Sequence, residues 1–110
     1  MNWIGIDTTR YSKVVRAFVD RNPDAVVRLG KRVVNTNPDD WCTNGNLKSL
    51  RDFSLTVGDQ EILSFHDHPD ELTAPQDQLS LVEELAGQKL LRFRILHEKP
   101  SLFQKLFGRK

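Results

Sequence analysis

The chain has 110 residues, of which 38% are hydrophobic and 28% charged, and its formal net charge is +1. This length suits one domain with an apolar core that needs no metal or disulfide, and the single Cys42 excludes an intramolecular disulfide. The near-zero charge, the lack of a basic leader and the lack of an apolar run of about 20 residues predict a cytoplasmic protein without a transmembrane segment.

The charges are segregated along the chain. Residues 59–84 contain eight acidic residues and no Lys or Arg, whereas residues 89–110 contain seven Lys and Arg residues and one acidic residue. The simpler interpretation is that the acidic segment folds beside the basic one and neutralises it, and the alternative is a functional bipolar surface.

The first predicted element is a helix over residues 8–21. Its apolar side chains recur at helical spacing, and Asp7, Thr8 and Thr9 are candidates for its N-cap. Residues 25–36 are ambiguous, because Pro23 would open a second helix well. The β-branched residues on both sides of Gly30 favour a hairpin, with strands at 25–29 and 32–36.

Residues 37–50 are rich in Asn, Asp and Gly, which predicts a loop with a turn at Asn44-Gly45. The next residues alternate in hydrophobicity and predict a hairpin with strands at 53–57 and 61–66. A three-residue loop, 58–60, would place Phe53 opposite Phe65 and so keep the apolar side chains on one face.

The sequence Thr73-Ala74-Pro75-Gln76 is typical of a capping box that opens a helix, and Gly87 is the residue expected just after its end. A strand at 90–96 follows. Because a helix between two strands forms a crossover, this strand is expected to lie parallel to 61–66, with 52–57 between them.

Together these elements predict an α+β fold, in which an N-terminal helix, hairpins, a second helix and a closing strand form a mostly antiparallel sheet with helices on one face. We expect one domain over residues 1–98, followed by an amphipathic basic tail at 99–110. The predicted core consists of Tyr11, Val14, Phe18, Phe53, Leu55, Leu63, Phe65, Leu79, Val82, Leu85, Leu91, Phe93 and Ile95.

The first candidate site is a metal centre formed by His66, His68 and Asp70. The two histidines alternate along a strand and share one side, Asp70 follows in the turn, and His97 is a possible fourth ligand. Residues 62–70 resemble the strand-then-HxHxDH signature of metallo-β-lactamase-fold hydrolases, which implies Zn or Mn chemistry. Glu71 stands where that signature has a histidine, and the chain is too short for that fold, so we assign no family. The alternative is a polar strand end facing water.

Two neighbouring residues suggest other roles. Cys42 follows Asp39 and Asp40, which would raise its thiol pKa, so we interpret it as an ordinary reduced thiol rather than a nucleophile. Trp41 would anchor an interface if its loop exposed it, and would otherwise fold back over the core.

Two basic segments are candidate surfaces. Lys89, Arg92 and Arg94 form a basic stripe that could contact phosphate, although cross-strand pairing with an acid such as Glu61 is simpler. Nucleic-acid binding is not expected, because no aromatic side chain shares that face. The tail could dock on its own domain, insert into a partner or contact a membrane surface weakly, through its apolar residues Leu102, Phe103, Leu106 and Phe107.

The sequence has no phosphate-cradling Gly-rich loop, no GxSxG and no CxxC. We therefore favour a non-catalytic protein–protein interaction module without a cofactor, such as a small bacterial-type adaptor, inhibitor or accessory protein. Its partner would be another protein or a second copy, contacted by residues 39–47 and 101–110. The alternative is a small metal-dependent hydrolase that uses His66, His68 and Asp70.

Overall fold

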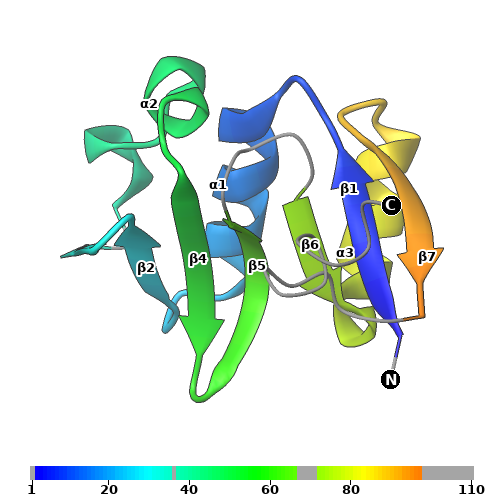
Figure 1. Ribbon diagram of the computed structural model, residues 1–110. Coiled ribbons are helices and arrows are strands. Elements are labelled where there is room, and N and C mark those ends of the chain that lie inside the picture. Colours follow the sequence, from blue (N-terminus) through cyan, green and yellow to red (C-terminus); the bar gives the residue numbers. More distant parts are fainter. Residues whose placement is uncertain (1, 36, 67–71, 98–110) are drawn as a thin grey trace, which may run out of the picture.

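The fold is seen in a computed structural model that describes residues 2–35, 37–66 and 72–97 (Figure 1). The strands are β1 (Trp3–Asp7), β2 (Val26–Leu29), β3 (Arg32–Val34), β4 (Asp52–Val57), β5 (Gln60–His66), β6 (Leu72–Pro75) and β7 (Arg92–Leu96). The helices are α1 (Tyr11–Arg21), α2 (Asn44–Lys48) and α3 (Leu79–Gly87), with 3₁₀ turns at Pro38–Asp40 and Gln76–Gln78.

The strands form one seven-stranded antiparallel sheet in the order β3-β2-β4-β5-β6-β1-β7. Helices α1 and α3 lie on the same face of this sheet, and α2 lies at one end of it (Figure 1). The predicted α+β fold with a mostly antiparallel sheet is therefore confirmed.

A strand that the sequence analysis did not anticipate precedes the first helix. Strand β1 lies between β6 and β7, and its Ile4 and Ile6 side chains are fully buried. These two residues alternate with Trp3, Gly5 and Asp7, a run too short for its periodicity to be distinctive in the sequence. The N-terminal residues therefore occupy an interior position in the sheet.

The 25–36 segment is a hairpin, as favoured, with strands at Val26–Leu29 and Arg32–Val34 and a positive φ of 64° at Gly30 in the turn. The 37–50 segment differs from the predicted loop, because Asn44 and Gly45 open helix α2 instead of forming a turn. The Thr43 side chain accepts a hydrogen bond from the Asn46 amide at 3.1 Å and caps this helix.

The β4–β5 hairpin keeps the predicted pairing of Phe53 with Phe65, and their rings stack with centroids 5.7 Å apart. The connection is shorter than predicted, since Val57 pairs with Gln60 and only two residues turn the chain. A bulge at Ile62 on β5 adds the missing residue and restores the register.

The capping-box interpretation of residues 73–76 is wrong. Thr73 lies within strand β6, where the neighbouring Leu72 and Ala74 side chains are fully buried. Helix α3 begins only at Leu79, after the 3₁₀ turn. The burial of two apolar side chains on alternate positions outweighs the local preference for a helix start.

The end of α3 also differs from the prediction. Gly87 is the last helical residue, and Lys89 adopts the left-handed conformation (φ 63°) expected of a glycine. The Lys89 amide bonds to the Ala86 carbonyl at 2.9 Å and the Leu90 amide to the Leu85 carbonyl at 3.0 Å. This pair of bonds is a Schellman motif centred on a lysine.

Strand β7 lies at the edge of the sheet, beside β1. Strands β6 and β7 both run antiparallel to β1, so α3 is a crossover between two parallel strands. A crossover into this strand was expected from the sequence, but with its first strand at 61–66 rather than at β6. Strand β7 instead runs antiparallel to β5 and is separated from it by β6 and β1.

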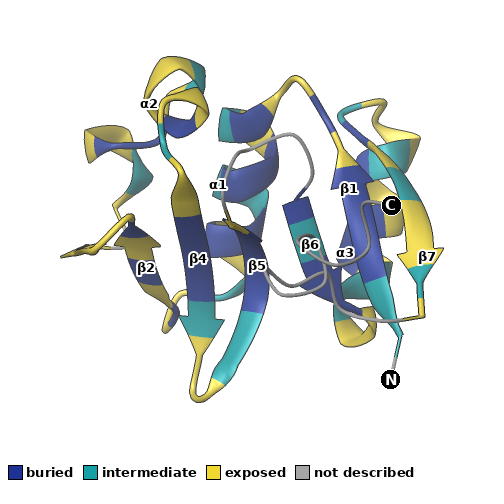
Figure 2. Cartoon of the chain, viewed as in Figure 1, coloured by how far each residue is buried: buried dark blue, intermediate teal, exposed yellow. Residues whose placement is uncertain are grey.

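The core lies between the helices and the sheet face that they cover (Figure 2). Most of the predicted core residues are buried there, and Leu79 and Phe93 pack against it while partly exposed. Ile95 is 40% exposed, so its assignment to the core is wrong. Its position on an edge strand explains this, since no further strand covers its outer side among the described residues.

Candidate functional site

His66, the first residue of the predicted metal set, ends strand β5 on the surface. Its Nε2 lies 3.4 Å from Glu61 Oε1 and its Nδ1 lies 3.5 Å from Asp52 Oδ1. His68 and Asp70 lie outside the described residues, so the three-ligand site stays a prediction. Within the described ranges, no group of three or more His, Cys, Asp and Glu side chains is arranged to hold a metal ion.

His97 cannot complete that site, because it lies at the opposite end of the sheet. The β-ladder aligns one residue from each of four strands in a row: Ser64, Thr73, Gly5 and Arg94. His66 lies two residues beyond this row in one direction and His97 three residues beyond it in the other. Five residues along the strands and three strand spacings across them separate the two backbones by about 22 Å. The Nδ1 atom of His97 instead lies 3.3 Å from Asn2 Oδ1.

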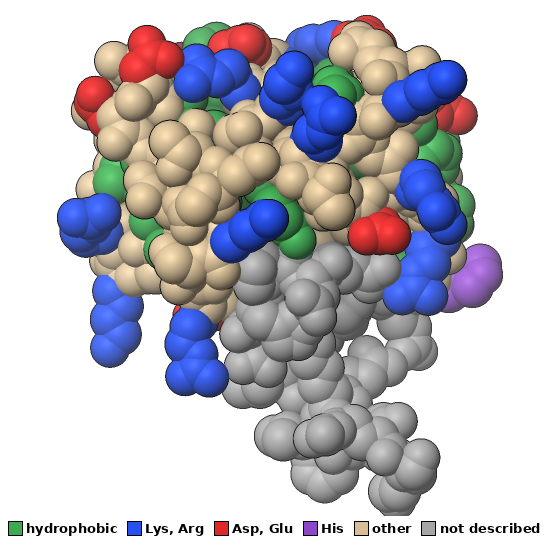
Figure 3. Space-filling view, turned by 90° about the horizontal axis from the view of Figure 1, so that it is seen from above, with side chains coloured by type: hydrophobic (Ala, Val, Ile, Leu, Met, Phe, Trp, Pro, Cys, Tyr) green, Lys and Arg blue, Asp and Glu red, His purple; other side chains and the backbone are tan. Residues whose placement is uncertain are grey.

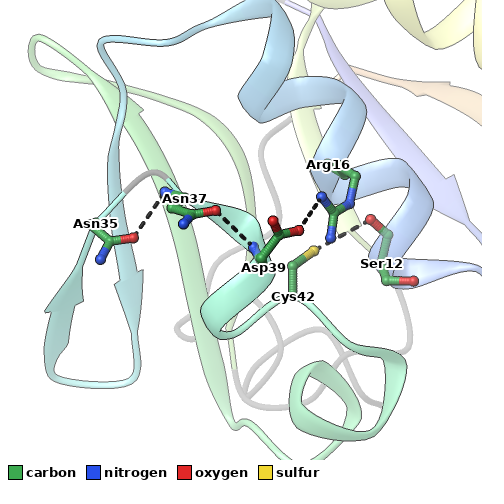
Figure 4. A network of polar contacts seen from close by, with 6 residues as sticks. All are labelled: Ser12, Arg16, Asn35, Asn37, Asp39 and Cys42. Carbon is green, nitrogen blue, oxygen red and sulfur yellow. Dashed lines mark hydrogen bonds and ion pairs between the residues drawn. The ribbon is translucent and has the colours of Figure 1, made fainter.

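Cys42 is buried against the first turns of α1 (Figure 4). Its Sγ donates to the Ser12 carbonyl at 3.4 Å. Burial raises the pKa of the Cys42 thiol above its ordinary value of 9.0, and the charge of Arg16 and a backbone hydrogen bond offset this only in part. The raised pKa of Cys42 is therefore caused by desolvation, and not by the neighbouring carboxylates that the sequence suggested. Such a thiol is a poor nucleophile at neutral pH.

The carboxylate of Asp39 is instead paired with Arg16, whose Nη1 lies 2.9 Å from Asp39 Oδ1 (Figure 4). This ion pair and the Cys42 hydrogen bond both join the 38–42 segment to α1. A chain of side-chain bonds continues along the segment, because Asn37 Oδ1 accepts from the Asp39 amide at 3.2 Å. These contacts fold the segment onto the domain.

Trp41 belongs to this folded segment and does not form an exposed anchor. Its side chain is 4% exposed, and its Nε1 donates a hydrogen bond to the Asn35 carbonyl at 2.9 Å. Trp41 therefore folds over the core, as in the second of the two interpretations of the sequence. The indole is therefore not available as a contact surface, and the reason is that burying it removes a large apolar area from water.

Strand β7 forms an edge of the sheet, and no described strand pairs with its outer side. Register with Ile4 and Ile6 places Phe93 and Ile95 toward the helices, so Arg92 and Arg94 project from the opposite face. Both arginines are exposed. Pairing of these arginines with Glu61, suggested from the sequence, is not possible, because two strands separate β7 from Glu61 on β5.

Lys89 does not continue this stripe along β7. It lies in the turn after α3 and lines a cleft between the β1–α1 connection and the α3–β7 connection. The cleft has a volume of about 530 Å³ and is lined by Asp7, Thr8, Thr9, Arg10, Ala86, Lys89, Leu90, Leu91 and Arg92. Figure 3 views the molecule from above, and Lys and Arg side chains are spread over the face that it shows.

This cleft was not expected from the sequence. Lys89 and Arg92 were identified there as part of a basic stripe, but Arg10 was not among the candidate site residues. The available signal was that Arg10, Lys89 and Arg92 each lie at a junction between a turn and a regular element. That signal does not show that the turns meet, because the position of β1 beside β7 was not predicted.

Comparison with known proteins gives no functional information, since no protein-family model, curated protein or solved structure matches this chain. None of the helices in the described ranges is long and apolar enough to cross a membrane. The tail residues Leu102, Phe103, Leu106 and Phe107 lie outside those ranges, so the contact surface expected there stays a prediction.

Proposed function

We propose that this protein is a non-catalytic interaction module whose β7 edge pairs with an extended, acidic segment of another protein. The observation that carries this proposal is the edge itself, a five-residue strand with two exposed arginines and no strand on its outer side among the described residues. An edge strand offers backbone amide and carbonyl groups to a strand from another chain.

The side chains of β7 define the chemistry of the segment that would bind. Arg92 and Arg94 project on one face, and the partly buried Phe93 and exposed Ile95 project on the other. A strand paired with β7 alternates in the same way. It therefore places acidic residues beside the arginines and apolar residues beside Phe93 and Ile95.

The same charges argue against a second copy as the occupant. Two antiparallel β7 strands would bring the arginines of one chain beside those of the other, and like charges in opposite positions destabilise a sheet. The edge at β3 is less suitable for pairing, because it has only three residues. The proposed partner is accordingly a different, acidic chain, and the cytoplasmic location expected from the sequence is part of this proposal.

A non-catalytic role is supported by the burial of Cys42, the candidate nucleophile, and of Trp41, the candidate contact residue. Cys42 is buried with a raised thiol pKa, and Trp41 is enclosed in the fold. The metal-dependent hydrolase remains the alternative prediction, since it depends on His68 and Asp70. Metal analysis of untagged protein tests it, because stoichiometric Zn or Mn that is lost in His66→Ala and His68→Ala variants would support the hydrolase.

The edge proposal is tested with a capped seven-residue peptide of alternating Glu and Val, compared with one in which Lys replaces Glu. We expect the wild-type chain to bind the Glu peptide about tenfold or more tightly than the Lys peptide, and the Arg92→Glu/Arg94→Glu variant to reverse this preference. Arg28→Glu is the matched control, because Arg28 is exposed on the same face of the sheet but on β2.

Isothermal calorimetry gives the affinities, and amide chemical shifts locate the peptide. Shifts confined to β7 and β1 support the proposal. Equal affinity for both peptides, the same loss in Arg28→Glu, or concentration-dependent self-association through β7 would each refute it.

A further inference from the structure

We propose that the cleft between the β1–α1 and α3–β7 connections binds the phosphate group of a small ligand. Three of the residues that line it, Arg10, Lys89 and Arg92, are basic and come from three separate parts of the fold. This inference does not depend on strand pairing at the β7 edge, and the two proposals can fail independently.

The topology explains why these three residues line the same cleft. Strands β1 and β7 are antiparallel neighbours, so β1 ends where β7 begins, with Asp7 opposite Arg92. The chain leaves β1 through Thr8 and Thr9 to reach Arg10 at the start of α1, and it enters β7 from Lys89. Both connections therefore lie at the same end of the sheet, on either side of the cleft.

None of these cations has an ion-pair partner among the described residues. Among the described residues, no carboxylate oxygen lies within 4.0 Å of the charged nitrogens of Arg10, Lys89 or Arg92. Asp7 is the only acidic residue among the described residues that line the cleft, and even its position opposite Arg92 gives no ion pair. Three basic residues and one acidic residue leave the cleft with a formal charge of +2, which a bound dianion would neutralise.

The arginines within helix α1, which begins directly after Arg10, are paired. Arg16 and Arg21 of α1 lie 2.9 Å from Asp39 and 3.4 Å from Glu84, respectively. Helix α1 thus has acidic partners for these cations, whereas Arg10 faces the cleft without one in the described part of the chain. Gathering unpaired like charges disfavours the folded state unless an anion binds between them.

The walls of the cleft are joined by a hydrogen-bond bridge. The Thr8 hydroxyl accepts from the Arg10 amide at 2.8 Å and donates to the Leu90 carbonyl at 2.6 Å. This single side chain connects the two segments that carry Arg10 and Lys89. Because the bridge fixes their separation before binding, less conformational entropy is lost when an anion enters.

The cation set favours phosphate over a carboxylate. At neutral pH a phosphate monoester carries about 1.5 to 2 negative charges and three acceptor oxygens, while a carboxylate carries one charge and two oxygens. Two guanidinium groups and one ammonium group offer more donors than a carboxylate can use. The volume of about 530 Å³ leaves room for the rest of a small phosphorylated molecule.

The test is an amide-shift titration of the full chain with inorganic phosphate at pH 7.5 and low ionic strength. Glycerol 3-phosphate provides the organic monoester, sodium acetate the carboxylate, and sodium chloride the ionic-strength control. We expect saturable shifts at residues 8–10 and 89–92 with both phosphates. Acetate should bind at least tenfold more weakly than phosphate.

Arg10→Gln and Lys89→Gln should each weaken phosphate binding about tenfold, the loss of one charge-assisted hydrogen bond. The matched control is Lys31→Gln, since Lys31 is exposed in the β2–β3 turn, away from the cleft. Non-saturating shifts, equal binding of acetate, or equal weakening in Lys31→Gln would overturn the proposal. A dispersed amide spectrum for each variant shows that it is folded.

The variants also separate this proposal from the edge proposal. Arg94 lies on β7 but does not line the cleft. Arg94→Glu should therefore leave phosphate binding within twofold of wild type while weakening capture of the Glu–Val peptide. Arg10→Gln should do the opposite.

Discussion

Asn44 Oδ1 accepts a hydrogen bond from the Ser12 amide at 2.8 Å, so a side chain of α2 caps the first turn of α1. Arg10 occupies the N-cap position of α1 itself and forms no side-chain cap. Thr8, which the sequence suggested for this role, bonds instead to the Arg10 amide and to Leu90. Residues 32 positions apart thus complete the start of the helix.

Removing this cap should destabilise the whole domain. We predict that Asn44→Ala lowers the free energy of unfolding by about 1 kcal/mol, because the Ser12 amide loses its acceptor. Asn44→Asp keeps an acceptor oxygen and should recover most of the loss. Urea denaturation followed by circular dichroism measures both. Equal stability of Asn44→Ala and wild type would show that the bond contributes nothing.

Lys89 adopts a backbone conformation that favours glycine, with φ at 63°. We predict that Lys89→Gly raises the free energy of unfolding by about 0.5–1 kcal/mol, since the left-handed strain is relieved at some cost in chain entropy. Lys89→Ala removes the same charge but keeps the left-handed strain, so the further gain of Lys89→Gly over Lys89→Ala measures the strain alone. The measurement is thermal unfolding of the three proteins without phosphate.

The same Lys89→Gly protein should bind inorganic phosphate about tenfold more weakly. A gain in stability together with a loss of phosphate binding is expected if Lys89 contributes to binding while its backbone conformation destabilises the fold. A variant that is neither more stable nor weaker in phosphate binding would contradict this account.

Trp41 should contribute strongly to stability because it is buried and its indole nitrogen is hydrogen-bonded. We predict that Trp41→Phe lowers the free energy of unfolding by about 1–3 kcal/mol through loss of the bond to the Asn35 carbonyl. Trp41→Ala should cost about 3–5 kcal/mol, because it also leaves a cavity. Chemical denaturation provides the values. An unchanged midpoint in Trp41→Phe would mean that the bond is not formed in solution.

The raised thiol pKa of Cys42 predicts a specific dependence of stability on pH. Burial favours the neutral thiol in the folded state, so this contribution is complete below the ordinary thiol pKa of 9.0 and is lost as the pH rises above it. We expect the free energy of unfolding to fall more steeply above pH 9 in wild type than in Cys42→Ala. Other groups also titrate above pH 9, so the contribution of Cys42 is the difference in the pH dependence of the free energy of unfolding between wild type and Cys42→Ala. Identical pH profiles would disprove the raised pKa.

Local patterns predicted several elements correctly because neighbouring residues suffice to define them. Helical spacing located α1, and the β-branched residues around Gly30 located the β2–β3 hairpin. The apolar face of the β4–β5 hairpin also identified the pairing of Phe53 with Phe65, although the turn length was wrong. Matching apolar faces determines register more strongly than the loop does, because a bulge can absorb one residue.

The candidate sites were predicted less well, because each depends on which segments meet. By residue type, His66 and His97 could bind the same metal ion, yet the strand order places them at opposite ends of the sheet. Trp41 lies in a polar stretch that resembled an exposed loop, and long-range contacts bury it. Arg10 and Lys89 meet because β1 lies beside β7, and no local pattern encodes that pairing.

The sequence by itself determined the class of fold and the periodic faces of its main helices and hairpins, since these follow from the spacing of apolar residues along the chain. The tertiary structure alone decided that the first strand enters the sheet, that β7 is an edge of the described sheet, and that Arg10, Lys89 and Arg92 line one cleft. The physical reason is that strand neighbours are chosen by the burial of side chains distant in sequence, such as Ile4, Leu72 and Ala74.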